Sequence, residues 1–217
     1  MKILNLKTMR KIILSVLLIT ILVLSIFFFY FLSESTTLGA HVVELKLDTG
    51  DTAWMIVATA LVLLMTPGLG FFYGGMVGKK NVISTVLQSF MAMVIVTVLW
   101  VVVGFGLCFG PSIGGFIGNP SYNLFFNGVS ANTAWELAPT IPMILFALFQ
   151  AKFAIITPAL ITGAFAERVR FWAYLLFMVL FILFIYAPLC HMTWHPDGLF
   201  FGWGVLDFAG GTVVHMS

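Results

Sequence analysis

Long apolar stretches without charge dominate the chain and predict helices that cross a membrane. A crossing helix needs about 20 mostly apolar residues, and the sequence first supplies such a run from Ile12 to Leu32. Four more runs lie at about 53–77, 82–109, 141–165 and 172–194. A last apolar segment begins near Gly204 and stops at Ser217, which is too short to cross. The pattern predicts an all-α, polytopic membrane protein whose last helix is truncated.

The first apolar run has the layout of a secretory signal. Four basic residues precede it, namely Lys2, Lys7, Arg10 and Lys11. The run is longer than the usual apolar core of a signal peptide, about 7–15 residues, which favours an uncleaved anchor, although small residues just after it permit cleavage. We therefore interpret residues 1–33 as a signal peptide or signal anchor, residues 34–51 as an external linker and residues 52–217 as a membrane domain.

Basic residues between the apolar stretches predict the orientation of the chain. Lys79 and Lys80 separate two spans, and Arg168 and Arg170 separate another two. If every stretch crosses, these charges and the basic N-terminus all lie on one side. Cytoplasmic loops of membrane proteins carry an excess of Lys and Arg. We therefore expect cytoplasmic basic loops in a multi-pass protein of the cell membrane, and the signal-like N-terminus fits a bacterial inner membrane.

The composition excludes the common classes of soluble protein. Hydrophobic residues make up 61% of the chain and charged residues 8%, against about 45–50% and about 25% in soluble domains. A formal net charge of +2 without a basic patch gives no footprint for nucleic acid. No catalytic Ser/His/Asp set or metal-ligand spacing is visible, and His191 and His195 stand at the end of a span, where solvated histidines are common. We therefore expect no enzyme activity, metal or cofactor.

Helix-breaking and small residues interrupt two of the spans. Pro67 lies inside one span and is followed by Gly70 and Gly74, which form a small-xxx-small face. Pro158 interrupts another span. A close helix crossing or a kinked helix that lines a pathway would both account for these residues, and frequency favours the close crossing.

The last apolar segment holds Asp207 and His215, two polar residues that are costly in a membrane unless protein or water surrounds them. On a helix they would be about 12 Å apart along the axis, too far for a direct hydrogen bond. Asp207 either caps the helix or binds a cation, and the cap is favoured. His215 either packs against a neighbouring helix or relays a small polar solute or a proton. Gly210 and Gly211 allow a helix or a narrow lumen to approach the backbone.

Three residues of the middle spans are notable for their position. Trp194 ends a span, where tryptophan is usual at the membrane interface, although its ring can also attract a cation. Phe153 lies in mid-span and carries no signal alone. Lys152 beside it is a cation in mid-span, and neighbours on a helix point about 100° apart, so it can face away from Phe153.

Three motifs together resemble the ammonium transporter family, specifically the Amt branch of the Amt/Mep/Rh proteins. They are the run DFAGGTVVH from Asp207 to His215, the run from Thr66 to Gly75, and the segment from Phe149-Gln150 to the ITGAFAER sequence that ends at Arg168. The resemblance covers about residues 50–217 in the right order, and DFAGGTVVH is its most specific part.

The resemblance implies an architecture and a set of site residues. Members have eleven spans per subunit, as two inverted five-helix halves and a final helix, in a homotrimer, and this chain matches the first half only. Trp194 matches the residue that recruits the cation at the outer site, and Phe153 matches one of two stacked phenylalanines that close the vestibule. Asp207 matches the acidic residue that supports the outer site, and His215 matches the first of two pore histidines.

By the same resemblance, the expected function is ammonium or ammonia transport across the membrane. The aromatic residue would recruit the cation, an apolar pore would pass neutral ammonia, and the pore histidines would handle the proton. A PII-type cytoplasmic regulator is implied as a partner. Two alternatives stay open: an ammonium sensor of the same fold, and a truncated fragment that does not transport.

Overall fold

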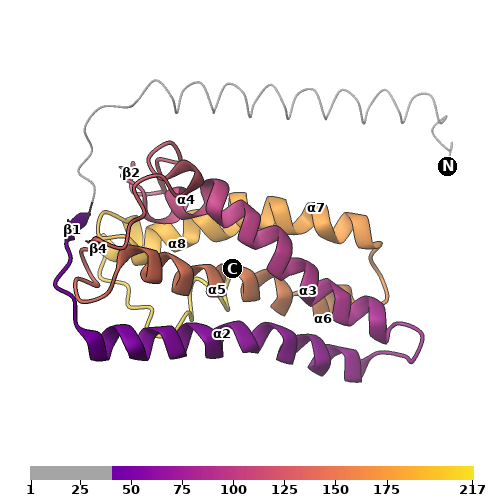
Figure 1. The fold of residues 1–217 in the computed structure, drawn as a ribbon. Helices are drawn as coiled ribbons and strands as arrows, with labels where there is room; N and C mark the ends of the chain where they lie inside the picture. The colour runs from indigo at the N-terminus through magenta and orange to yellow at the C-terminus, as the bar shows by residue number, and fades with distance from the viewer. Residues whose placement is uncertain (1–40) are drawn as a thin grey trace, which may run out of the picture. The chain divides into compact units, whose positions relative to one another are not determined.

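Helices make up most of the chain in the computed structural model, which describes residues 41–217. The segment that we interpret as a signal therefore lies outside the described residues. The four longest helices are α2 (Thr49–Met76), α3 (Val82–Leu99), α5 (Met143–Leu160) and α7 (Phe171–Phe181). α2, α3 and α5 pack against one another, and α7 packs against α3 (Figure 1).

Three of these helices are extended by shorter ones. α3 passes through a π-helical turn, Trp100–Gly104, into α4 (Phe105–Phe109), and α5 is followed by α6 (Thr162–Phe165). α7 passes through a second π-helical turn, Ile182–Tyr186, into α8 (Ala187–Trp194), and α9 (Leu199–Gly202) follows. Helices long and apolar enough to cross a membrane therefore cover Thr49–Met76, Val82–Phe109, Met143–Phe165 and Phe171–Gly202. The prediction of a helical, multi-pass membrane protein is confirmed.

The first described span begins at Thr49, earlier than the apolar pattern indicates. Asp48 is its N-cap, and the carboxylate Oδ1 accepts the backbone N–H of Asp51 at 2.8 Å. This bond satisfies one of the amides that have no partner at a helix start. The end of the segment that we interpret as a linker is thus the first turn of α2.

Two small antiparallel sheets lie outside the spans and add to the all-α architecture. β1 (Val42–Glu44) pairs with β4 (Thr133–Trp135), with Val43 opposite Ala134. β2 (Ser112–Ile113) pairs with β3 (Ile117–Gly118). β1, β2 and β4 gather at one end of the long helices (Figure 1). β1 lies just before α2, and β4 lies in the long loop between α4 and α5. Their pairing therefore joins these two parts of the chain.

Glycines set the close approach of α2 to α3. Gly70 and Gly74 are buried on α2. A Cβ atom at Gly70 would lie 3.1 Å from the Cβ of Ser89, and one at Gly74 would lie 2.8 Å from Cγ2 of Val86. These separations leave no room for a larger side chain. Pro67 lies in the same helix, one turn before this crossing.

Buried aromatic residues at the end of α3 join that span to α5. The Trp100 side chain is 1% exposed, and its indole N–H donates to the carbonyl of Ala147 on α5 at 3.0 Å. Trp100 also contacts Phe105 edge to face, with ring centroids 5.9 Å apart. The hydrogen bond matters because a buried indole N–H without an acceptor is costly.

The last segment is not the helix that we predicted from Gly204. Residues 203–217 form turns, bends and irregular chain. Gly204 and Gly210 have φ values of +78° and +83°, in the left-handed region, which ends a right-handed helix. The Asp207 carboxylate also accepts backbone N–H groups of this segment, in place of helical carbonyls. Gly210, one of the two glycines that we expected to allow a close approach, is therefore also a turn residue.

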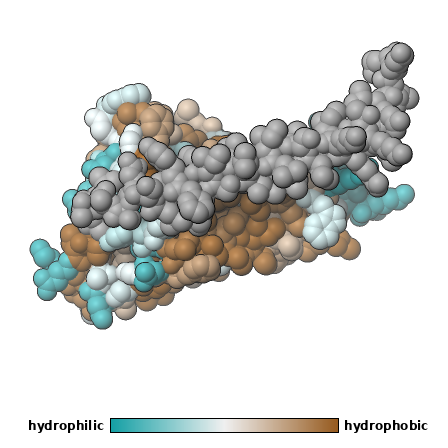
Figure 2. Space-filling view, turned by 90° about the horizontal axis from the view of Figure 1, so that it is seen from above, coloured by the Kyte–Doolittle hydropathy of each residue, from teal (hydrophilic) through white to brown (hydrophobic). Residues whose placement is uncertain are grey.

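The sides of the helices are strongly apolar. Only 17% of the most apolar stretch of α2 is buried within the described chain. Large apolar side chains such as Ile83 and Trp172, which are 82% and 79% exposed, face outward. Hydrophobic surface follows the helices, while hydrophilic residues gather near their ends (Figure 2). In a membrane this surface contacts lipid or other protein.

Candidate functional site

A cavity of about 430 Å³ lies between α5, α8 and the last segment. Its walls are Phe149, Gln150, Phe153, Trp194, Asp207, Phe208, Ala209 and Gly210. Three of the four residues that the resemblance assigned to substrate binding, Phe153, Trp194 and Asp207, therefore line one cavity. They come from three separate elements of the chain.

Aromatic rings form one side of this cavity. Phe153 contacts Phe149 edge to face, with ring centroids 5.0 Å apart, and contacts Trp194 in the same way at 6.3 Å. Phe149 and Phe153 are four residues apart, so they lie on one face of α5. The edge-to-face arrangement leaves the electron-rich face of at least one ring in each pair free for a cation.

Two oxygen atoms without hydrogen-bond partners form the polar part of the wall. They are Oδ1 of Asp207 and Oε1 of Gln150, and both are buried. A buried acceptor without a partner costs free energy, so a ligand that donates hydrogen bonds would gain by binding here. A second cavity of about 350 Å³ shares Phe149 and Gln150 with the first, so Gln150 lies between the two.

The turn of the last segment positions the Asp207 carboxylate. Its Oδ2 accepts the backbone N–H of Thr212 at 3.2 Å and that of Val213 at 3.1 Å. These bonds fix the side chain, and they leave Oδ1 without a hydrogen-bond partner. A Cβ atom at Gly210 would lie 2.9 Å from Val214, so the tight turn requires glycine there.

Two other residues singled out from the sequence lie away from the cavity. His215 is exposed and does not line it, and its backbone N–H donates to the carbonyl of Gly210 at 3.0 Å. Lys152 is half-buried and is not among the lining residues either. The cation in mid-span is therefore separate from the aromatic wall formed by its neighbour Phe153.

Side-chain hydroxyls around Pro158 bond to backbone carbonyls of α5. The hydroxyl of Thr157 donates to the carbonyl of Phe153 at 2.6 Å. The Tyr174 hydroxyl donates to the carbonyl of Pro158 at 3.4 Å and lies 3.0 Å from the hydroxyl of Thr162. The carbonyls near the proline thus have side-chain donors.

His191 and His195 are not the solvated histidines that we expected at the end of a span. Both are fully buried, and their rings stack with centroids 4.3 Å apart. Nδ1 of His191 bonds to the carbonyl of Cys108 at 2.9 Å, and Nε2 bonds to Oγ of Ser112 at 2.8 Å. The long loop before α5 folds over this end of α8, which removes both rings from solvent.

His41, next to β1, joins the same end of α8. Its Nε2 donates to Oδ2 of Asp197 at 2.8 Å, and its Nδ1 bonds to the carboxylate of Glu136. Burial opposes the charged ring, but the hydrogen bonds to Asp197 and Glu136 outweigh it and raise the pKa of His41 above its usual value. The His41 imidazole therefore bridges two carboxylates, and both favour its charged form.

A family model matches the part of the chain that forms the cavity between α5, α8 and the last segment. The Ammonium Transporter Family model matches residues 53–217, which include every residue that lines the larger cavity and all four described spans except the first turn of α2. The chain belongs to the ammonium transporter family. The resemblance drawn from the DFAGGTVVH run and its companions is confirmed.

Similar proteins of known sequence and structure agree with membership of the ammonium transporter family. An "Ammonium transporter" from Aquifex aeolicus is 44% identical over 182 residues, which cover 82% of this chain and 41% of that protein. A crystal structure of the G343C mutant of Candida albicans Mep2 matches with a TM-score of 0.71 and 33% identity, covering 78% of this chain and 37% of that one. A structure titled "Sensor Amt Protein" matches with a TM-score of 0.67, covering 75% and 40%. The chain therefore spans about two fifths of the length of these family members.

Sequence reasoning missed four residues of the cavity between α5, α8 and the last segment, namely Phe149, Gln150, Phe208 and Ala209. All four belong to motifs that pointed to the ammonium transporter family, and Phe149 lies one helical turn before Phe153. That spacing was the available signal, since residues four apart share a helix face. Nothing in the sequence indicated that an unpartnered amide oxygen would lie between two cavities.

Proposed function

We propose that this chain forms the first half of an ammonium transporter and that its cavity recruits the ammonium ion. The observation that carries the proposal is the combination of aromatic rings with two unpartnered oxygens, from Asp207 and Gln150, in one wall. Ammonium carries one positive charge and four N–H donors, so it matches both features. A potassium ion would meet the rings but could donate no hydrogen bond to the oxygens.

Transport follows from the difference between the ion and neutral ammonia. A bare ion in an apolar lumen is very costly, while ammonia is much less so. The ion would therefore release its proton after the aromatic wall, and His215 would receive or relay it. His215 is exposed in this half of the protein, and we propose that the other half covers it and completes the pore. Members of the family transport as homotrimers, and we propose the same assembly and a PII-type regulator here.

Transport currents of the native full-length protein in liposomes test the recruitment step. A cation–π contact to a desolvated ring is worth about 1–2 kcal/mol. Trp194→Leu should therefore raise the ammonium concentration for half-maximal current about 5- to 30-fold. Trp203→Leu is the matched control, because Trp203 is exposed and does not line the cavity. Equal half-maximal concentrations for the two variants would contradict the proposal.

Asp207 and His215 test the later steps in the same assay. Asp207→Asn keeps an oxygen for the backbone N–H groups of the turn but removes the charge, and it should abolish the current. His215→Ala should abolish the current as well, because the proton would lose its route. Undiminished, ammonium-selective currents in His215→Ala would exclude this mechanism.

The sensor alternative predicts a different pattern from the same preparation. A sensor would bind ammonium, and Trp194→Leu would weaken that binding, but the unmodified protein would give no current. The match to the structure titled "Sensor Amt Protein" is the observation that keeps this alternative in view.

A further inference from the structure

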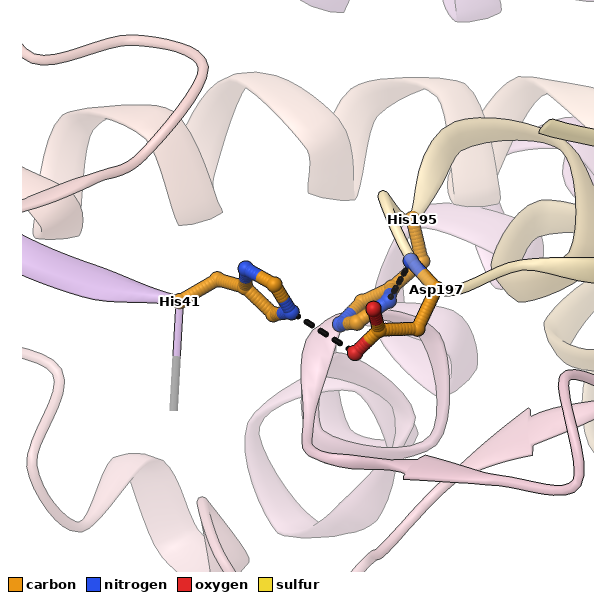
Figure 3. A group of neighbouring side chains, drawn as sticks. All are labelled: His41, His195 and Asp197. Atoms are coloured by element: carbon orange, nitrogen blue, oxygen red, sulfur yellow. Dashed lines mark hydrogen bonds and ion pairs between the residues drawn. The ribbon is translucent and has the colours of Figure 1, made fainter. Parts of the chain in front are cut away.

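Three metal-ligating side chains outside the transport cavity converge at the end of α8. His41 directly precedes β1, and His195 and Asp197 come from the turn after α8. One ligand atom from each lies within 4.8 Å of the others. The three side chains point toward a common centre (Figure 3). We propose that His41, His195 and Asp197 bind a divalent transition-metal ion of the zinc class.

His195 supplies the strongest reason for a ligand at this point. Its side chain is fully buried, and its Nε2 has no hydrogen-bond partner. The ring is held in place by stacking on His191 and by an edge contact with His41, whose ring centroid is 4.8 Å away. A buried imidazole nitrogen that is aimed at a carboxylate and a second imidazole matches the donor set of zinc.

His41 is already oriented as metal-binding histidines are. In metal sites the imidazole usually donates its second N–H to a carboxylate while the other nitrogen binds the ion. Here Nδ1 of His41 bonds to Glu136, and Nε2 points at Asp197. Replacing the Nε2 proton with a metal ion would leave the bond to Glu136 in place. Glu136 is therefore a positioning residue and not a ligand.

Binding requires a small movement of the turn after α8. Ligands around tetrahedral zinc lie about 3.4 Å apart, since each bond is about 2.0–2.1 Å long. Nε2 of His41 and Oδ2 of Asp197, now 2.8 Å apart, must therefore separate slightly, while the group as a whole lies within 4.8 Å. The backbone N–H of Asp197 donates to Nδ1 of His195 at 3.1 Å, which places the ring proton on Nε2. When Nε2 binds the ion, that proton moves to Nδ1 and the bond from Asp197 opens. Both changes involve the same turn, residues 195–198.

Charge and access suit a divalent cation. The carboxylates of Asp197 and Glu136 would balance a 2+ ion between two neutral imidazoles. The Asp197 side chain is 55% exposed and that of His41 is 19% exposed, so an ion can reach the site from solvent. Three protein ligands leave a fourth position for water, as in open zinc sites. The site would tie β1 to the end of α8, directly after Trp194.

Zinc titration of the native full-length protein tests the site. The purified protein is stripped with a chelator, and Zn²⁺ is titrated in competition with a chromophoric chelator at neutral pH. We expect one tight site per chain. Glu136→Gln should weaken it about 10- to 100-fold, as loss of an orienting partner does. His41→Ala and Asp197→Asn should weaken it further, and both replace partly exposed side chains that the helices do not need for packing.

His215→Ala is the matched control, because it also removes one imidazole but lies outside the group. It should keep the affinity of the unmodified protein. Absence of stoichiometric Zn²⁺ binding, or equal affinities for His41→Ala and His215→Ala, would overturn the proposal. Ammonium transport does not enter this measurement, so its outcome is independent of the proposed function.

Discussion

The contact between α2 and α3 at Gly74 offers a quantitative test of how the spans pack. A methyl group at Gly74 would lie 2.8 Å from Cγ2 of Val86, which is closer than two carbon atoms can approach. Overpacking of this kind costs about 1–3 kcal/mol. Replacing a helical glycine by alanine also gains about 1 kcal/mol of helix propensity. Gly74→Ala should therefore be neutral to destabilising by about 2 kcal/mol.

Gly75→Ala separates the two contributions. Gly75 is the next residue of α2, and a Cβ atom there meets nothing within 4 Å. The gain in helix propensity is the same at both positions, so the difference between the variants is the packing cost, about 1–3 kcal/mol. The full-length protein should lose its folded state at a lower temperature as Gly74→Ala than as Gly75→Ala, measured by tryptophan fluorescence in detergent.

A double variant shows whether Val86 is the cause. Val86→Ala removes Cγ2, so it should lower the cost of Gly74→Ala and leave the effect of Gly75→Ala unchanged. If Gly74→Ala and Gly75→Ala melt at the same temperature, the two helices do not touch at this point and our account of the crossing is refuted.

Two further predictions concern hydrogen bonds at and between the spans. Hydrogen bonds from Asn81 and from the backbone N–H of Gly78 lower the pKa of Glu167. Their stabilisation is therefore complete above about pH 4.5 and is lost as the pH falls through the lowered pKa. In the unmodified protein, the protection of the amides in this loop, measured relative to their intrinsic hydrogen-exchange rates, should fall at acid pH, but in Glu167→Gln it should not change with pH. Trp100→Phe should destabilise the protein by about 1–3 kcal/mol, because it leaves the buried carbonyl of Ala147 without its donor. Trp172→Phe, at an exposed position, should leave the melting temperature unchanged.

The spans were predictable because membrane helices follow from hydropathy alone. The apolar runs matched four helices of crossing length, but the first begins earlier, at Thr49, and the last continues past 194 to Gly202. The earlier start of α2 came from Asp48, whose capping bond extends the helix beyond the apolar run. Hydropathy indicates where a segment is apolar, while a hydrogen bond decides where its helix begins.

The last segment could not be predicted because its apolar composition and its glycines favour different backbone structures. Its apolar composition favoured a helix, but the backbone of Gly210 adopts a left-handed conformation. The Asp207 carboxylate accepts the backbone N–H groups of Thr212 and Val213. We expected Asp207 to accept such groups as a helix cap, but here it accepts them within a turn.

The histidine group at the end of α8 was beyond sequence reasoning for a different reason. Its members are separated by more than 150 positions, from His41 to His195, and no ligand spacing connects them. The pairing of β1 with β4 places His41 beside Glu136, and the contacts of His41 with Asp197 and His195 join it to the end of α8. By contrast, Phe153, Trp194 and Asp207 were predicted because their motifs resemble a known family. A family resemblance carries information about the fold, while the spacing of residues along the chain does not.

The pairing of β1 with β4 also sets an order for biosynthesis. Val43 pairs with Ala134, which is 91 residues later in the chain (134 − 43). At about 5–20 residues per second, the ribosome needs about 5–18 s to make the second strand after the first. During that interval α2 has already been synthesised, and within the described chain only 17% of its most apolar stretch is buried. Lipid can solvate this surface in the meantime, so closure of the two strands is a late event that fixes a helix already in place.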